Sequence, residues 1–110
     1  MLTRINCPIV YVDDVDVAVS FYTGTIGFTV VERSGDFVEL TLGDTRLALN
    51  KADGLTKVAG RQTLILESDG IAADFARLQS ELEILEPLCD HGYGPTFIFS
   101  DPFGNKLEVI

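Results

Sequence analysis

Apolar and polar positions along the chain change their spacing several times, and each spacing predicts one kind of element. Residues 5–12 are mostly β-branched or aromatic, which predicts a strand. Apolar residues then recur at helical spacing over 15–22, which predicts a short amphipathic helix capped by Asp13 or Asp14. Further β-rich segments, separated by turn residues, predict strands at 28–33, 37–42 and 46–50.

The second half of the chain follows the same order. Residues 63–67 predict a strand, Asp69 is a candidate helix cap, and an apolar stripe from Ile71 to Leu82 predicts a second helix. Pro87 interrupts the next β-rich segment, which places that segment at a sheet edge or a strand end. Strands are predicted at 83–88, 95–100 and 106–110.

Each half of the chain therefore has the order strand, helix, strand, strand, strand. The two helical stripes lie at a constant offset of 56 residues, with Val15 matching Ile71. This repetition predicts an α+β fold with an internal duplication. We expect a single domain over residues 1–110, with modules at about 1–53 and 61–110 and a linker at about 54–60.

Composition predicts a folded domain without a nucleic-acid or membrane partner. The chain has 110 residues, 46% hydrophobic and 23% charged, which is enough apolar side chain to fill one core. With 8 basic and 17 acidic residues, its net charge of −9 repels nucleic acids and anionic membranes and favours a neutral or cationic small ligand. The alternative is that the acidic charge only keeps the protein in solution.

Cysteine content and the lack of long apolar runs indicate the compartment. Cys7 and Cys89 are too few for a disulfide scaffold and lack the spacing of a zinc site, so we expect reduced thiols. The first residues show no apolar segment typical of a secretory signal, and no run approaches the roughly 20 apolar residues that cross a bilayer. These features predict a soluble, cytoplasmic protein.

Two segments carry motifs of a known family. They are residues 11–28 (YVDDVDVAVSFYTGTIGF) and residues 99–108 (FSDPFGNKLE). With them, the chain resembles the vicinal oxygen chelate superfamily, which includes glyoxalase I, extradiol dioxygenases, fosfomycin-modifying enzymes and bleomycin resistance proteins. The resemblance covers nearly the whole chain, with Ile26 where the family usually has leucine.

The resemblance implies two βαβββ modules that form an open, curled, mixed sheet around a concave cavity, with the helices on the convex side. Metal-dependent members carry His, Glu or Tyr ligands on the first and last strands of the modules. The matching positions here are Cys7, Ala48, Thr63 (or Leu64) and Glu108. Only Glu108 suits a hard divalent ion, so we expect neither a metal nor another cofactor.

Three residues have both a structural and a functional interpretation. Cys7 is either a small apolar residue or a nucleophile. Glu108 is a solvated carboxylate, an anionic anchor for a ligand, or a general base. Tyr93 lies between two glycines, next to Gly92 and close to His91, in a segment that is either a lid or an exposed loop.

Strand alternation selects candidate binding residues on the concave face. Leu107 and Val109 are expected to face the helix, which leaves Glu108 on the opposite face. Aromatic rings with carboxylates suit a flat or cationic molecule, and the alternative is that Phe37 or Tyr11 packs in a dimer interface. The candidate ligand-binding residues are Tyr11, Phe37, Glu39, Glu67, Tyr93, Ile98 and Glu108.

The resemblance and the residues together favour metal-independent binding of a small cationic or aromatic organic molecule, as in drug sequestration by bleomycin resistance proteins. The alternative is a glyoxalase-like lyase, isomerase or dioxygenase in which Glu108 is a base or a metal ligand. A third possibility is a domain without a retained site. The expected partner is a second copy in a twofold-symmetric homodimer, because a small sheet of two modules has edges to cover.

Overall fold

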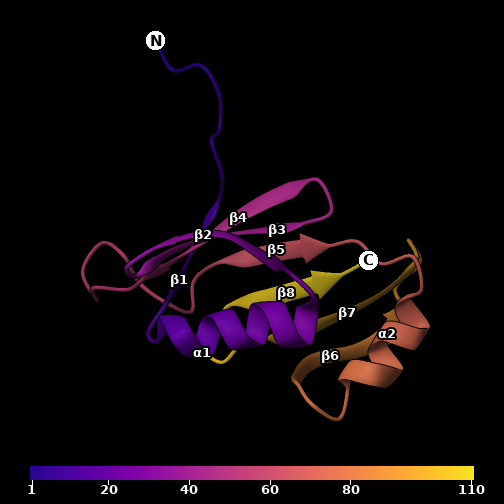
Figure 1. Cartoon of the computed structure of the whole chain (residues 1–110). Helices are drawn as coiled ribbons and strands as arrows, with labels where there is room; N and C mark the ends of the chain where they lie inside the picture. The colour runs from indigo at the N-terminus through magenta and orange to yellow at the C-terminus, as the bar shows by residue number, and fades with distance from the viewer. The chain divides into compact units, whose positions relative to one another are not determined.

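The order strand, helix and three strands occurs twice in the computed structural model, which describes residues 1–110 (Figure 1). The chain divides into two units, Met1–Ala59 and Gly60–Ile110. Each unit has one open, four-stranded mixed sheet with a helix in the connection after its first strand. The predicted α+β class with two βαβββ modules is confirmed. Neither helix has the length and continuous apolarity that crossing a bilayer requires.

The first unit has the strand order β1-β4-β3-β2, with β1 parallel to β4 and the other neighbours antiparallel. Asp14 caps α1, because its carboxylate accepts the Val17 N–H at 3.1 Å. The helix continues as a π-helical segment and ends at Gly27, whose φ of 111° is open to glycine. The elements are β1 (Ile9–Val12), α1 (Val15–Ser20), η1 (Phe21–Ile26), β2 (Thr29–Ser34), β3 (Phe37–Leu42) and β4 (Thr45–Lys51).

Alternate residues of the first sheet form its core on the side of α1. Val10 and Val12 are fully buried, and α1 packs against β3 and β4. From the helix and η1, Ala18 and Tyr22 are fully buried as well. The alternation leaves the residues between these on the opposite face of the sheet.

The second unit has the order β5-β8-β7-β6. Pro87 lies in the edge strand β6, as predicted, and the β6–β7 register shifts on both sides of Glu86. The core of the second unit contains Phe97 and Phe99 of β7. The elements are β5 (Thr63–Leu66), α2 (Ile71–Leu78), β6 (Glu83–Asp90), β7 (Pro95–Ser100) and β8 (Lys106–Val109).

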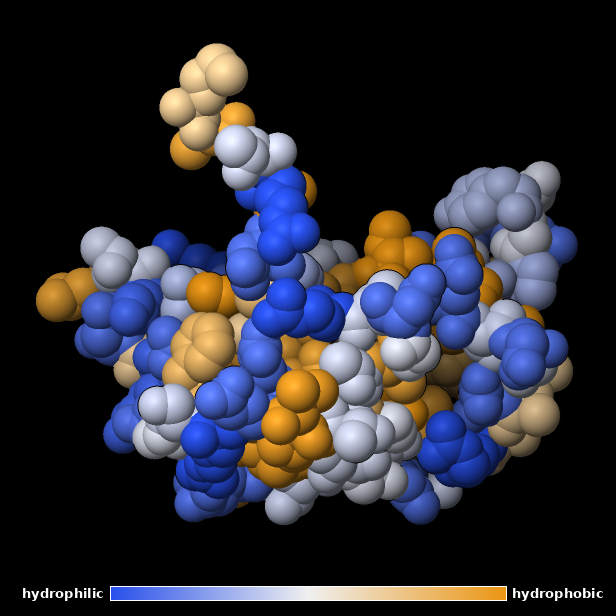
Figure 2. Space-filling view, turned by 45° about the horizontal axis from the view of Figure 1, so that its top comes forward, coloured by the Kyte–Doolittle hydropathy of each residue, from blue (hydrophilic) through white to orange (hydrophobic).

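Four local predictions were wrong. The α-helix predicted over 15–22 ends at Ser20 and continues as the π-helical η1 to Ile26. The first strand begins at Ile9, not at residue 5, because Pro8 has no N–H with which to extend the ladder. The exposed N-terminal end of the chain extends away from the first unit (Figures 1 and 2). Gly70, and not Asp69, precedes α2. The second helix ends at Leu78, four residues before the end of the apolar stripe.

Asp53 organises the segment after β4 through its side chain. The carboxylate accepts the N–H groups of Leu55 at 2.8 Å and Lys57 at 3.0 Å. These hydrogen bonds, that of Leu55 first, hold the pKa of Asp53 below its ordinary value of 3.8, because they stabilise the charged form.

A pH titration followed by NMR is therefore expected to show the Asp53 carboxyl carbon changing with a midpoint below 3.8. Because the folded pKa is depressed, this contribution to stability is present above the unfolded pKa and is lost as pH falls through the folded pKa. The amide signals of Leu55 and Lys57 should shift with the same midpoint. A midpoint at or above 3.8 would contradict the assigned hydrogen bonds.

Candidate functional site

The first sheet carries a row of polar and aromatic residues on the face opposite its core. Tyr11 of β1 is in register with Asn50 of β4, and Asn50 is in register with Phe37 of β3. Phe37 is in turn opposite Ser34 of β2. Side chains in register lie on one face of a sheet, so the predicted residues Tyr11 and Phe37 share a face.

The neighbouring row contains the carboxylates. Ile9 is in register with Ala48, Ala48 with Glu39, and Glu39 with Glu32. A hollow of about 260 Å³ lies over the β2–β3 end of the two rows. Its lining residues are Glu32, Ser34, Phe37 and Glu39.

The two glutamates of this hollow differ in their partners. Arg46 Nη2 donates to Glu39 Oε1, in an ion pair between neighbouring strands. Glu32 is exposed, and its carboxylate has no ion-pair or hydrogen-bond partner. The exposed fraction of Phe37 is 37%, so its ring is open to a ligand. The hollow therefore combines an aromatic ring, a hydroxyl, one neutralised carboxylate and one free carboxylate.

Sequence reasoning missed Glu32 and Ser34. The signal was present in the hairpin, because a two-residue turn at Gly35 and Asp36 pairs Ser34 with Phe37 and hence Glu32 with Glu39. A strand assignment without this register does not say which face of β2 each residue occupies.

In the second sheet, Glu108 lies between two isoleucines. It is in register with Ile65 on one side and with Ile98 on the other, and Ile98 is opposite Glu86. Glu108 and Ile98 are half-buried and lie together on the face opposite the core. Ile65 follows Ile9 by 56 residues, so Glu108 and Ala48 occupy equivalent positions in the two ladders.

Glu67 and Tyr93 are not in register with Glu108 or Ile98. Glu67 follows the last residue of β5 and lines a hollow with Ser68, Asp69 and Asp74, where no aromatic ring is present. The exposed fraction of Tyr93 is 75%, and its ring stacks on that of His91 with centroids 6.1 Å apart.

Backbone N–H groups of the loop that carries Tyr93 donate hydrogen bonds to a side chain at the end of β6. The Asp90 carboxylate accepts the N–H groups of Gly92 at 2.8 Å and Gly94 at 3.1 Å. His91 Nε2 lies 3.4 Å from Glu86 Oε1. The side chains of Asp90, His91 and Glu86 thus stabilise the turn between β6 and β7, and the phenol ring of Tyr93 lies exposed on this turn.

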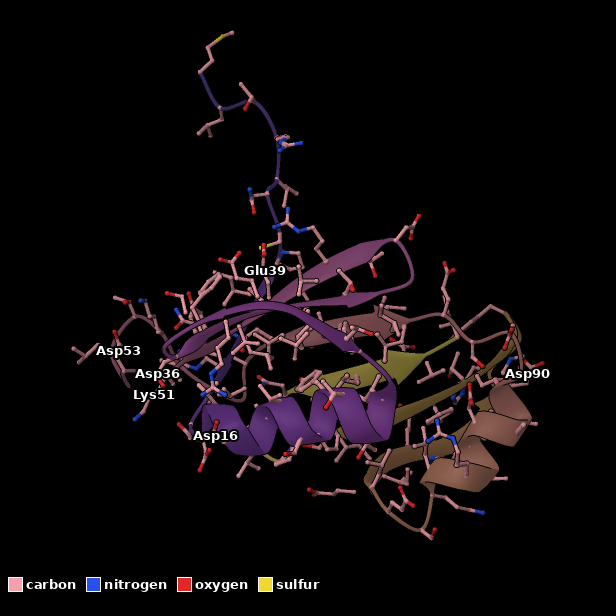
Figure 3. All side chains as sticks on the ribbon, viewed as in Figure 1. Asp16, Asp36, Glu39, Lys51, Asp53 and Asp90 are labelled. Carbon is pink, nitrogen blue, oxygen red and sulfur yellow. The ribbon has the colours of Figure 1, made fainter.

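A separate charged hollow lies at the N-terminal end of α1. Asp16, Asp36 and Lys51 gather there, whereas Glu39 lies on the face of the first sheet turned away from α1 (Figure 3). Arg33 pairs with Asp16 at 2.8 Å across this hollow. It contains no aromatic side chain, unlike the hollow at Phe37.

The sequence model of the glyoxalase/bleomycin resistance protein/dioxygenase superfamily matches residues 4–109. The chain belongs to this superfamily. No curated protein matches the sequence.

Solved structures share the fold of this superfamily member over nearly its whole length. A protein of unknown function from Agrobacterium tumefaciens has a TM-score of 0.83 at 26% identity, over 99% of this chain and 94% of that one. TnmS3, an antibiotic-binding protein from Streptomyces sp. CB03234, has a TM-score of 0.80 at 25% identity, over 98% and 94%. The bleomycin-binding protein of Streptomyces verticillus has a TM-score of 0.77 at 22% identity, over 99% and 97%.

The residues at the metal-ligand positions implied by the superfamily do not fit a divalent ion. Ala48 offers only a methyl group and is fully buried. Cys7 precedes β1, Thr63 has a neutral hydroxyl, and Glu108 is the one carboxylate of the set. Nowhere in the chain do three or more His, Cys, Asp or Glu side chains gather in a group that could hold a metal ion.

Proposed function

We propose that this superfamily member binds a small cationic or aromatic organic molecule without a metal ion, and so sequesters it. The observation that carries the proposal is the hollow in which Phe37 lies beside Glu32 and Glu39. An aromatic face attracts a cation or a flat ring, and a carboxylate adds charge pairing. TnmS3, an antibiotic-binding protein that shares the fold, supports binding as the class of function.

The proposal includes the other predicted contacts on each unit. Tyr11 shares the face of Phe37, and Ile98 shares that of Glu108. Glu67 and Tyr93 would act from the ends of their own elements. We also propose that residues 1–110 act as one domain in a homodimer, and that the protein is cytoplasmic, where its free Cys7 and Cys89 stay reduced.

Thermal unfolding with a panel of cationic and aromatic compounds, including metal-free bleomycin, tests the proposal. At least one compound is expected to raise the melting temperature, because a ligand that binds only the folded state stabilises it. Phe37→Leu keeps apolar bulk but removes the aromatic face, and should weaken that ligand about two- to tenfold. Leu55→Ala, at an exposed position of the same unit, is the matched control and should leave binding unchanged.

Two results would contradict this function. One is a panel in which no compound shifts the melting temperature. The other is stoichiometric metal in the purified protein that Glu108→Gln removes, since this would make Glu108 a ligand in spite of its neighbours.

A second candidate is a glyoxalase-like lyase, isomerase or dioxygenase activity. The observation in its favour is the half-buried Glu108 between Ile65 and Ile98, because apolar neighbours are a usual setting for a carboxylate that acts as a base. Mass spectrometry of each bound compound after incubation separates the two classes. Recovery of the compound unchanged supports binding, and a conversion abolished in Glu108→Gln supports the enzyme.

A further inference from the structure

The charge of the Phe37 hollow depends on a residue outside its lining. Arg46 of β4 is in register with Thr41 of β3, and Glu39 of β3 is in register with Ala48 of β4. Arg46 and Glu39 are therefore diagonal neighbours on these two adjacent strands. Its guanidinium donates to the Glu39 carboxylate. The exposed fractions of the two side chains are 45% and 20%, so the pair lies at the surface of the sheet.

Glu32 completes the charge count of the hollow. Its backbone lies opposite that of Glu39, but its carboxylate has no cationic partner. The adjacent cation in the sequence, Arg33, points to the other face of β2, where it pairs with Asp16. The two glutamates and Arg46 therefore sum to one negative charge, next to the open ring of Phe37.

We infer that this hollow selects a singly charged organic cation with a flat or apolar arm, and that Arg46 sets this preference by neutralising Glu39. The inference rests on the proposed function of the same site. Phe37 receives the arm or the face of the cation, and Glu32 receives the charge. A second positive charge on the ligand meets a carboxylate that Arg46 already occupies, so it gains little and is repelled by the guanidinium.

The test compares benzylammonium with p-xylylenediammonium, which share a benzene ring and differ by one charge. Dissociation constants are measured by NMR titration of the backbone amides at low ionic strength, in the wild type and in Arg46→Gln. Removal of the guanidinium frees Glu39, so the preference for the dication over the monocation should rise about two- to fivefold, the range of an exposed ion pair. The amides of Glu32, Ser34 and Phe37 should shift on binding.

Two further variants separate the local effect from a general one. Arg46→Lys keeps the positive charge and should retain a preference close to that of the wild type. Arg33→Gln changes the net charge of the protein as much as Arg46→Gln does but leaves Glu39 paired, and should not change the preference.

Each failure has its own meaning. A monocation that binds at the hollow with a preference unaffected by Arg46→Gln overturns the role of Arg46 and leaves the proposed function in place. Amides of the hollow that respond to neither cation in any variant overturn the inference and remove the hollow as the binding site. An equal rise of the preference in Arg33→Gln overturns the inference by making the effect one of net charge.

Discussion

Replacing Phe97 by alanine is expected to lower the free energy of unfolding by about 3–5 kcal/mol, the range for truncating a buried phenylalanine. Phe97 is fully buried in β7, and its ring centroid lies 5.2 Å from that of Phe75 on α2 and 6.1 Å from that of Phe99. The ring therefore fills the space between helix and sheet in the second unit. Urea unfolding followed by circular dichroism measures the loss.

Phe37→Ala is the matched control, because it truncates the same residue type on the outer face of a sheet. With 37% of Phe37 exposed, the change should cost no more than about 2 kcal/mol. A Phe97→Ala protein as stable as the control would contradict the assignment of Phe97 to the core. The free energy of unfolding of a small domain is only about 5–15 kcal/mol, so Phe97→Ala removes a large part of it.

Most of the fold follows from the sequence because burial in each unit has a simple period. The strand predicted at 37–42 is β3 to the residue, since its alternation and the flanking turns at Gly35 and Gly43 agree. The edge position of β6 follows from Pro87, whose missing N–H makes a central strand unfavourable.

The wrong predictions of secondary structure fall where the structure depends on an interaction that the neighbouring sequence does not reveal. Ile5 has the β-branched side chain of the strand that follows it, but a strand exists only where a partner ladder can form, and β1 begins at Ile9. Over so short a length, the π-helical segment Phe21–Ile26 has the same apolar face as an α-helix, so the spacing of apolar residues does not distinguish the two. Asp69 has the side chain of a cap, yet Gly70 is the N-cap of α2 and no side chain accepts a hydrogen bond at the start of this helix as a cap.

For the candidate site, the sequence predicts which residues of one strand share a face, but it does not predict which residues of neighbouring strands lie side by side. Alternation alone places Phe37 and Glu39 on one face of β3. Pairing Glu39 with Arg46 needs the register of β3 against β4, and adding Glu32 needs the register of the β2–β3 hairpin. Charge selection arises from these inter-strand relations, which is why composition gives only a general preference for cations.

Replacing Asn105 by alanine is expected to lower the free energy of unfolding by about 2–4 kcal/mol, because it removes the hydrogen bonds of a buried side chain. Asn105 is 2% exposed, and its Oδ1 accepts the N–H groups of Gly60 at 2.9 Å and Gln62 at 3.2 Å. Its Nδ2 donates to Asp101 at 2.9 Å, and that aspartate is also 2% exposed. One amide side chain thus joins the turn before β8 to the segment before β5.

Thermal unfolding should show Asn105→Ala melting more than about 10 °C below the wild type, since 1 kcal/mol corresponds to several degrees in a domain of this size. Asn6→Ala, at an exposed position, is the control and should melt with the wild type. Gly60→Ala should reproduce the loss from the other side of the same contact, because its Cβ would lie 2.9 Å from the Phe103 carbonyl oxygen at a φ of 84°. If Asn105→Ala melted with the Asn6 control, the hydrogen bonds of this amide would not hold the two segments together, and the Asp101-Pro102-Phe103-Gly104-Asn105 motif would need another structural reason.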